Sequence, residues 1–167
     1  DFKYETATII AWSASNWSSS FTISKGASNS SVKAGDPIIT ETGALVGFIK
    51  DVGPMSSTCL TVLDTTFSAG AVIDRNNDVA VASGDFTLMR EGLLKLDYLT
   101  DSTQIVSGDT ITTSGKGGVM PAGLVIGTVS EVRQHESGIR RYATIVPAAE
   151  LDNLINVFVI TSFEIAE

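Results

Sequence analysis

The segments S-V-K-A-G-D-P-I-I-T-E-T-G (residues 31–43) and Q-I-V-S-G-D-T-I-T-T-S-G (residues 104–115) are two copies of one pattern. The pairs Gly35-Asp36 and Gly108-Asp109 coincide when the copies are aligned, at a shift of about 73 residues. Similar apolar stretches follow, A-L-V-G-F-I-K-D-V in the first copy and L-V-I-G-T-V-S-E-V in the second. This internal repeat predicts two related modules in tandem.

Short segments in which apolar and polar residues alternate occur along the whole chain. They are rich in Ile, Val and Thr and are separated by clusters of Gly, Asn, Ser and Asp, which is typical of strands joined by turns. The predicted strands lie at 6–12, 20–24, 37–40, 45–52, 59–63, 78–82, 85–89, 93–99, 110–113, 125–132, 142–146 and 157–161. One short helix is predicted at 147–155, because Pro147 suits a first helical turn and three apolar residues after it share a face.

The predicted fold class is all-β, with two tandem small six-stranded β-barrels related by the repeat and one short helix near the C-terminus. About six short strands per module are too few to bury both faces of an open sheet, so closure into a barrel is expected. We expect residues 1–78 to form the first module and residues 79–167 the second, joined near D-R-N-N-D at 74–78. The last strand, 157–163, either completes its own barrel or returns to the first.

Glycines and one proline at the strand connections are expected to be structural. They are Gly26, Gly35, Gly43, Gly47, Gly108, Gly115, Gly118, Pro121, Gly123 and Gly127. The glycine-rich stretch at 112–129 does not fit a phosphate-binding loop, because Lys116 is followed by Gly-Gly and a strand where such a loop requires a helix. We expect an enlarged corner between two strands.

Composition argues against several classes of function. The 167 residues carry 11 Lys+Arg against 19 Asp+Glu, a formal net charge of -8, which disfavours nucleic-acid binding. Cys59 is the one cysteine, and no group of Cys, His or carboxylates has metal-site spacing. Small barrels fill their interior with side chains, so we expect neither a cofactor nor a metal.

Two barrels in tandem would also suit a chymotrypsin-like serine hydrolase, with Ser114 as the nucleophile. The lone His135 lies C-terminal to the serines in the barrel corners, so a His-Asp-Ser order cannot be built with it. We therefore expect no catalytic residues. If the chain is nevertheless a two-barrel serine hydrolase, we expect a degenerate one that lacks the usual triad.

Aromatic residues are the best candidates for contacts with a partner, because aromatics anchor protein interfaces. Trp12, Trp17 and Phe21 lie on or beside the first strands, where they form either the core or a binding patch. Trp17 and Phe21 of the first module and Tyr98 of the second are predicted to bind a partner.

The sequence resembles the MreC family of rod shape-determining proteins over nearly its whole length. The resemblance is carried by N-W-S-S-S-F-T-I-S-K-G (16–26), V-K-A-G-D-P-I-I-T (32–40), G-D-T-I-T-T-S-G-K-G-G-V-M-P-A-G-L-V-I-G-T-V (108–129) and P-A-A-E-L-D-N-L (147–154). None of these motifs is catalytic in the family.

The resemblance implies a non-enzymatic scaffold of the bacterial cell-elongation and peptidoglycan-synthesis machinery, made of two β-barrels. Members of the family link MreB and MreD to cell-wall synthases, including the elongation transpeptidase, a penicillin-binding protein, and they self-associate as oligomers or filaments. The implied location is the extracytoplasmic face of the cell membrane, with an N-terminal membrane span and a coiled coil preceding this region. A self-assembling module that joins through exposed edge strands is a further possibility.

Overall fold

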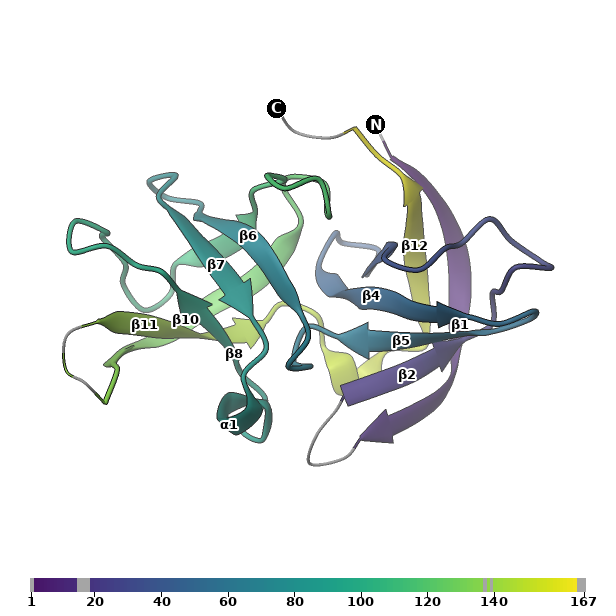
Figure 1. Ribbon diagram of the computed structural model, residues 1–167, viewed down its shortest axis with the longest axis horizontal. Helices are drawn as coiled ribbons and strands as arrows, with labels where there is room; N and C mark the ends of the chain where they lie inside the picture. Colours follow the sequence, from purple (N-terminus) through teal and green to yellow (C-terminus); the bar gives the residue numbers. More distant parts are fainter. Residues whose placement is uncertain (1, 15–18, 137, 139, 165–167) are drawn as a thin grey trace.

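The computed structural model describes residues 2–14, 19–136, 138 and 140–164, and it consists of two β-barrels side by side (Figure 1). Within these residues the strands are β1 (Lys3–Ala14), β2 (Ser19–Ile23), β3 (Pro37–Ile39), β4 (Leu45–Val52), β5 (Ser57–Thr61), β6 (Ser68–Ile73), β7 (Val79–Ser83), β8 (Leu94–Asp97), β9 (Thr110–Thr113), β10 (Val125–Gln134), β11 (Arg141–Pro147) and β12 (Asn156–Ser162). The helical turns are α1 (Phe86–Met89) and the 3-10 turn η1 (Leu151–Asn153).

Both barrels are closed, and their strands follow the same spatial order. Starting from β3, the first barrel runs β3-β4-β5-β2-β1-β12; starting from β9, the second runs β9-β10-β11-β8-β7-β6. The two orders match strand by strand, so the predicted repeat is confirmed as a structural repeat. The predicted fold class, all-β with two six-stranded barrels, is confirmed over the described part of the chain.

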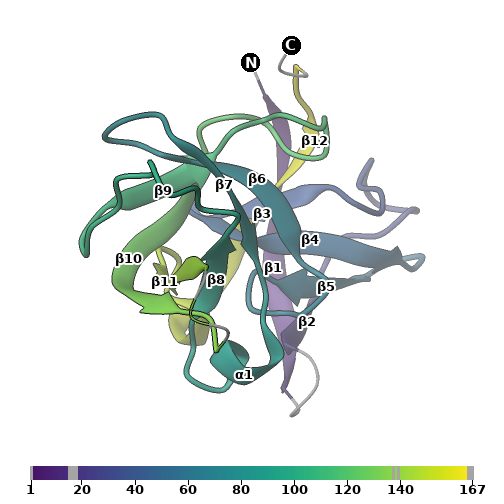
Figure 2. The same ribbon diagram turned by 60° about the vertical axis from the view of Figure 1, so that its left-hand side comes forward.

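Each repeat contributes its last strand to the opposite barrel. β6, at the end of the first repeat, pairs with β7 and β9 of the second barrel, whereas β12, at the end of the second repeat, pairs with β1 and β3 of the first. Figure 2 shows β12 leaving the second barrel to lie beside β1. The boundary expected after residue 78 therefore needs correction, because it separates the sequence repeats but not the barrels. The first barrel is β1–β5 with β12, and the second is β6–β11.

The polar segment D-R-N-N-D at 74–78, expected to join the modules, is the turn of the β6–β7 hairpin. Asn77 has a φ of 61° there, and its N–H donates to the Ile73 carbonyl oxygen at 2.8 Å. Asn tolerates this left-handed conformation better than most residues. The cluster of turn residues therefore marks a tight reversal inside one barrel.

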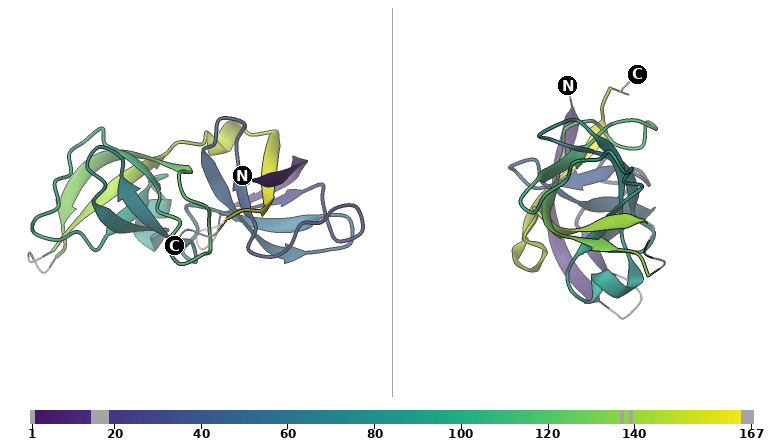
Figure 3. Two further views of the ribbon diagram at one scale, coloured as in Figure 1. Left: turned by 90° about the horizontal axis from the view of Figure 1, so that it is seen from above. Right: turned by 90° about the vertical axis from the view of Figure 1, so that its left-hand side faces the viewer.

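The barrels pack against each other through apolar side chains and one backbone contact. One core cluster includes Leu45 and Ile160 of the first barrel together with residues of β6–β11, and the connecting residue Phe67 is 1% exposed within it. The Val125 N–H donates to the Gly43 carbonyl oxygen at 3.1 Å. Viewed from above, the barrels lie next to each other along the longest axis (Figure 3). Burial of this kind makes the junction resemble a domain core.

The two Gly-Asp pairs build the same turn in each barrel. Gly35 and Gly108 have φ values of 91° and 95°, which side chains rarely adopt. The Asp36 carboxylate accepts the N–H of Lys33, and the Asp109 carboxylate accepts the N–H of Val106, both at 2.9 Å. Each aspartate thus satisfies the backbone N–H three residues earlier, at the start of its own turn.

Gly47 and Gly127, expected at strand connections, lie instead within β4 and β10, where they are required for close approach between strands. A Cβ at Gly47 would overlap the carbonyl oxygen of Leu60, and one at Gly127 would overlap that of Val146. These contacts occur at equivalent points of β4–β5 and β10–β11, and on the other side of each glycine the β3–β4 and β9–β10 ladders have a register shift. The repeat therefore preserves two places where the sheet bends sharply.

The glycine-rich stretch forms a strand-to-strand corner between β9 and β10. The Thr113 hydroxyl donates to the Pro121 carbonyl oxygen at 2.6 Å and accepts the Leu124 N–H at 2.9 Å, so one side chain holds both ends of the loop. The other predicted turn residues also lie in connections: Gly43, Gly115, Gly118 and Gly123 have positive φ, and Gly26 lies against the backbone of Gly53 and Pro54.

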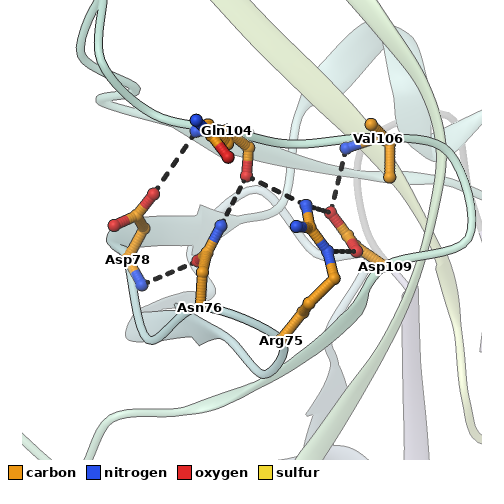
Figure 4. A network of polar contacts seen from close by, with 6 residues as sticks. All are labelled: Arg75, Asn76, Asp78, Gln104, Val106 and Asp109. Carbon is orange, nitrogen blue, oxygen red and sulfur yellow. Dashed lines mark hydrogen bonds and ion pairs between the residues drawn. The ribbon is translucent and has the colours of Figure 1, made fainter.

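A polar network holds the β6–β7 turn against the loop before β9 (Figure 4). Arg75 donates to both carboxylate oxygens of Asp109, at 2.9 and 3.1 Å, and Asn76 donates to the Gln104 carbonyl oxygen at 2.8 Å. The Gln104 N–H donates to Asp78 at 3.3 Å. Hydrogen bonds from Arg75 lower the pKa of Asp109, although burial of the carboxylate opposes this effect.

The helical turns differ in detail from the prediction. The helix expected at 147–155 is limited to η1, and Pro147 ends β11. Residues 85–89, expected as a strand, contain α1 instead. Asp85 caps it, because its carboxylate accepts the N–H groups of Thr87 and Leu88 at 3.1 and 3.0 Å.

Replacing either close-approach glycine is expected to destabilise the protein. Gly47→Ala and Gly127→Ala should each lower the free energy of unfolding by about 1–3 kcal/mol, since the new methyl group displaces a neighbouring strand. Urea unfolding followed by circular dichroism measures the change. Ser130→Ala, at an exposed position of β10, is the control and should unfold like the unaltered chain; unchanged midpoints for both glycine variants would contradict the close approach.

The Arg75–Asp109 pair is expected to make stability depend on pH. Because the pKa of Asp109 is lowered in the folded protein, its contribution is present above the unfolded value of about 4 and is lost as pH falls through the lowered value. Arg75→Gln should therefore reduce the difference in Tm between about pH 6 and about pH 3. Lys116→Gln removes an exposed charge as a control, and an equal reduction in both variants would argue against the pair.

Candidate functional site

The aromatic residues of the first barrel are divided between core and surface. Phe21 on β2 is 1% exposed and packs inside the barrel, so it does not reach a partner itself. Trp12 on β1 is 44% exposed, and its ring lies 5.1 Å from that of Phe21. Phe21 thus supports Trp12, which is the surface aromatic at this position. Trp17 lies outside the described residues.

Tyr98 of the second barrel lies at the surface in an unusual backbone conformation. It is 67% exposed and has a φ of 62°, which costs free energy for a residue with a bulky side chain. Its N–H donates to Asp97 at 2.8 Å. The prediction that Tyr98 is available to a partner agrees with this exposure, and contact with a partner remains a prediction.

Asp97 lies at the centre of a charged group on the outer face of β8. The Lys95 amine and the His135 ring lie 3.5 and 3.3 Å from its carboxylate. Burial acts to raise the pKa of Asp97, but hydrogen bonds from the Tyr98 N–H and from His135 bring it below the usual value. The ionised carboxylate therefore fixes the backbone that presents Tyr98.

A cleft of ≈ 560 Å³ lies between the barrels; we call it the interbarrel cleft. Apolar side chains from both barrels, among them Leu63, Met89 and Val146, line part of it. Arg90, Glu150 and Asp152 bring charges to its walls. Mixed apolar and charged lining of this kind suits a polypeptide better than a small apolar ligand.

The hydrolase alternative is not supported by the positions of its residues. The Ser114 hydroxyl accepts the N–H of Lys116 at 3.2 Å, whereas His135 contacts Asp97 and the ring of Tyr142. In the described chain no hydrogen bond joins this serine to the histidine, which a nucleophile and its base require.

The described residues contain neither a metal-binding cluster nor a membrane-spanning helix. No group of three or more His, Cys, Asp or Glu side chains there could hold a metal ion. No helix in the same part of the chain is long and apolar enough to cross a membrane.

Comparison with known proteins agrees with the two-barrel architecture. Residues 9–161 match the family described as rod shape-determining protein MreC, barrel core. The chain belongs to the MreC family. The cell shape-determining protein MreC of Geobacillus stearothermophilus is 37% identical over 175 aligned positions, which cover 96% of this chain and 57% of that protein. The chain therefore spans somewhat more than half the length of this MreC relative.

Solved MreC structures have the same fold. The crystal structure of MreC from Pseudomonas aeruginosa has a TM-score of 0.84 and 30% identity, covering 95% of this chain and 99% of that one. A complex between penicillin-binding protein PBP2 and MreC from Helicobacter pylori matches with a TM-score of 0.70 and 15% identity, covering 97% of this chain and 100% of that one. The second likeness concerns the fold alone.

Phe21 and Tyr98 are expected to behave oppositely when truncated. Phe21→Ala should lower the free energy of unfolding by about 3–5 kcal/mol, because it leaves a cavity under Trp12. Tyr98→Ala removes an exposed ring and should change the free energy of unfolding by less than about 0.5 kcal/mol. Chemical unfolding of both variants measures the difference; a small effect of Phe21→Ala would contradict its position in the core.

Proposed function

We propose that this chain is a non-enzymatic scaffold of the bacterial cell-elongation machinery, which binds cell-wall synthases and other copies of itself. Membership of the MreC family over residues 9–161 carries the proposal. The absence of a hydrogen-bonded Ser114–His135 pair in the described residues is consistent with it. The proposed location is the extracytoplasmic face of the cell membrane.

The proposed synthase partner is the elongation transpeptidase, a penicillin-binding protein. The Helicobacter pylori relative is named as a complex with such a protein, PBP2. MreD and MreB are proposed as further members of the same assembly, as the family resemblance implies. Two barrels joined by a common apolar core would hold such partners at fixed relative positions.

Self-association through a whole unpaired edge strand is not the proposed mode of assembly. Both barrels are closed, so neither has an edge strand that is unpaired along its whole length. Contacts between copies are instead proposed to use side chains on the barrel surfaces and loops.

Binding to the transpeptidase tests the scaffold directly. Immobilised extracytoplasmic transpeptidase from the same organism should bind this chain saturably in biolayer interferometry. Trp17→Ala or Tyr98→Ala is expected to weaken binding about tenfold if that ring is a central contact. Val132→Ala, at a position 36% exposed on β10, is the control.

The two parts of this prediction can fail separately. Absence of binding at tens of micromolar would contradict the synthase-binding part of the proposed function. Binding that is equal in the unaltered chain and in both aromatic variants would retain the scaffold and remove Trp17 and Tyr98 as its contacts.

A further inference from the structure

β1 changes its partner halfway along its length. Its first half, Lys3–Thr8, pairs with β12, and its second half, Ile9–Ala14, pairs with β2 on the opposite side. A strand has two hydrogen-bonding sides, so each half of β1 uses one side in these ladders. In the second half, the hydrogen-bonding side that faces the direction of β12 therefore has no partner strand.

β12 does not extend far enough to cover that side. Its first residue, Asn156, lies opposite Thr8, and the Ile9 N–H donates to the Ile155 carbonyl oxygen at 2.8 Å. The chain before Ile155 turns away into η1. Figure 1 shows β1 continuing past β12 with β2 beside it. Among the described residues, no strand pairs with this side of residues 10–14, which we call the open edge of β1.

The open edge has the features of a strand that accepts another strand. A bulge occurs between Ile9 and Ala11, but the register with β2 is regular from Ala11 to Ala14. Alternate N–H and C=O groups along such a segment point to its unpaired side. Natural edge strands are usually protected by Lys or Pro, and residues 4–24 contain no Lys, Arg or Pro.

Exposed apolar side chains accompany this backbone. Ile10 is 58% exposed and Trp12 44% exposed, and Ile155 at the neighbouring start of β12 is 68% exposed. The Phe21 ring packs against the Trp12 ring, with centroids 5.1 Å apart, and limits its movement. When a strand is added to a sheet, backbone hydrogen bonds provide affinity, and such side chains provide the contacts that select the sequence.

Charge indicates what kind of segment would bind. Glu150 and Asp152 lie in the segment that leads through η1 to Ile155, whose carbonyl oxygen accepts the Ile9 N–H at the beginning of the open edge. Glu150 and Asp152 are both exposed, and the whole chain has a net charge of -8. A strand on the open edge would therefore have one end beside a segment that carries two exposed carboxylates, which favours a bound segment with positive charge.

We propose that the open edge of β1 binds an extended, positively charged segment of a partner protein as an additional antiparallel or parallel strand. The proposal rests on the scaffold function above, because it assigns one surface to partner binding. The apolar side chains Ile10 and Trp12 contact alternate residues of the segment, and its basic end lies toward Glu150 and Asp152.

The probe is a short synthetic peptide in which Val and Thr alternate between lysines at both ends. Titrated into the nitrogen-labelled chain, it should give saturable shifts in the amide signals of residues 10–14 and slow their hydrogen exchange. Trp12→Thr should weaken binding about tenfold, through loss of buried apolar area. Val79→Thr, which alters a residue 56% exposed on the second barrel, should leave binding unchanged.

Two altered peptides separate strand addition from other modes of binding. N-methylation of alternate residues keeps the side chains but removes backbone donors, so this peptide should not bind; equal binding would overturn the proposal. Glutamates in place of the lysines should also abolish binding, and equal affinity would overturn the assignment of charge. Ile10→Thr is a second variant that should weaken peptide binding while the Trp12–Phe21 ring contact stays intact. It therefore tests the open edge even where Trp12→Thr disturbs the fold.

Failure of the open edge can be distinguished from failure of the scaffold. Lack of peptide binding by a chain that still binds the transpeptidase would overturn the open-edge proposal and leave the proposed function standing. Peptide binding by a chain that does not bind the transpeptidase would support strand addition at the open edge. It would overturn the proposal that the transpeptidase is the partner.

Discussion

The pairing of β12 with β1 and β3 is the interaction on which the first barrel depends. β12 supplies the buried Val157 and Val159 to the core of that barrel, and its Ile160 packs in the cluster that spans the junction. Without this strand, β1 and β3 would be edges of an open sheet. The same strand therefore closes one barrel and fastens it to the other, which makes the pair a single structural unit.

Much of the fold could be predicted from the sequence because the repeat preserves its turns. Gly35-Asp36 and Gly108-Asp109 recur because each turn needs a left-handed glycine and a carboxylate that accepts a backbone N–H. β6 was not predicted, since Ala69, Gly70 and Ala71 give weak apolar alternation. The return of β12 to the first barrel is one of the two alternatives that the sequence leaves open, whereas the transfer of β6 to the second barrel is not predicted, because strand pairing between distant segments is decided by packing and not by local pattern.

The candidate site was less predictable than the fold. Trp12 and Phe21 are register partners whose rings contact each other on the same face of the sheet, yet Trp12 is 44% exposed and Phe21 only 1%. Their exposure is decided by the neighbours that cover each ring, which the local sequence does not contain. The sequence predicts Tyr98 as a surface aromatic, but not its left-handed backbone, whose N–H is held by Asp97, itself in contact with His135 of the β10–β11 loop. The open edge of β1 follows from where β12 begins, which no local pattern contains.

The exchange of the last strands also orders events during synthesis on the ribosome. The second barrel is built from the continuous segment β6–β11, so all of its strands are available before β12 has been made. The first barrel is earlier in the chain, yet it stays open until β12, which follows the strands of the second barrel, has been made. Vectorial synthesis normally lets N-terminal domains fold first. Here the order is reversed, and the unclosed edges of β1 and β3 are exposed to pairing with neighbouring nascent chains for the time needed to translate the second half.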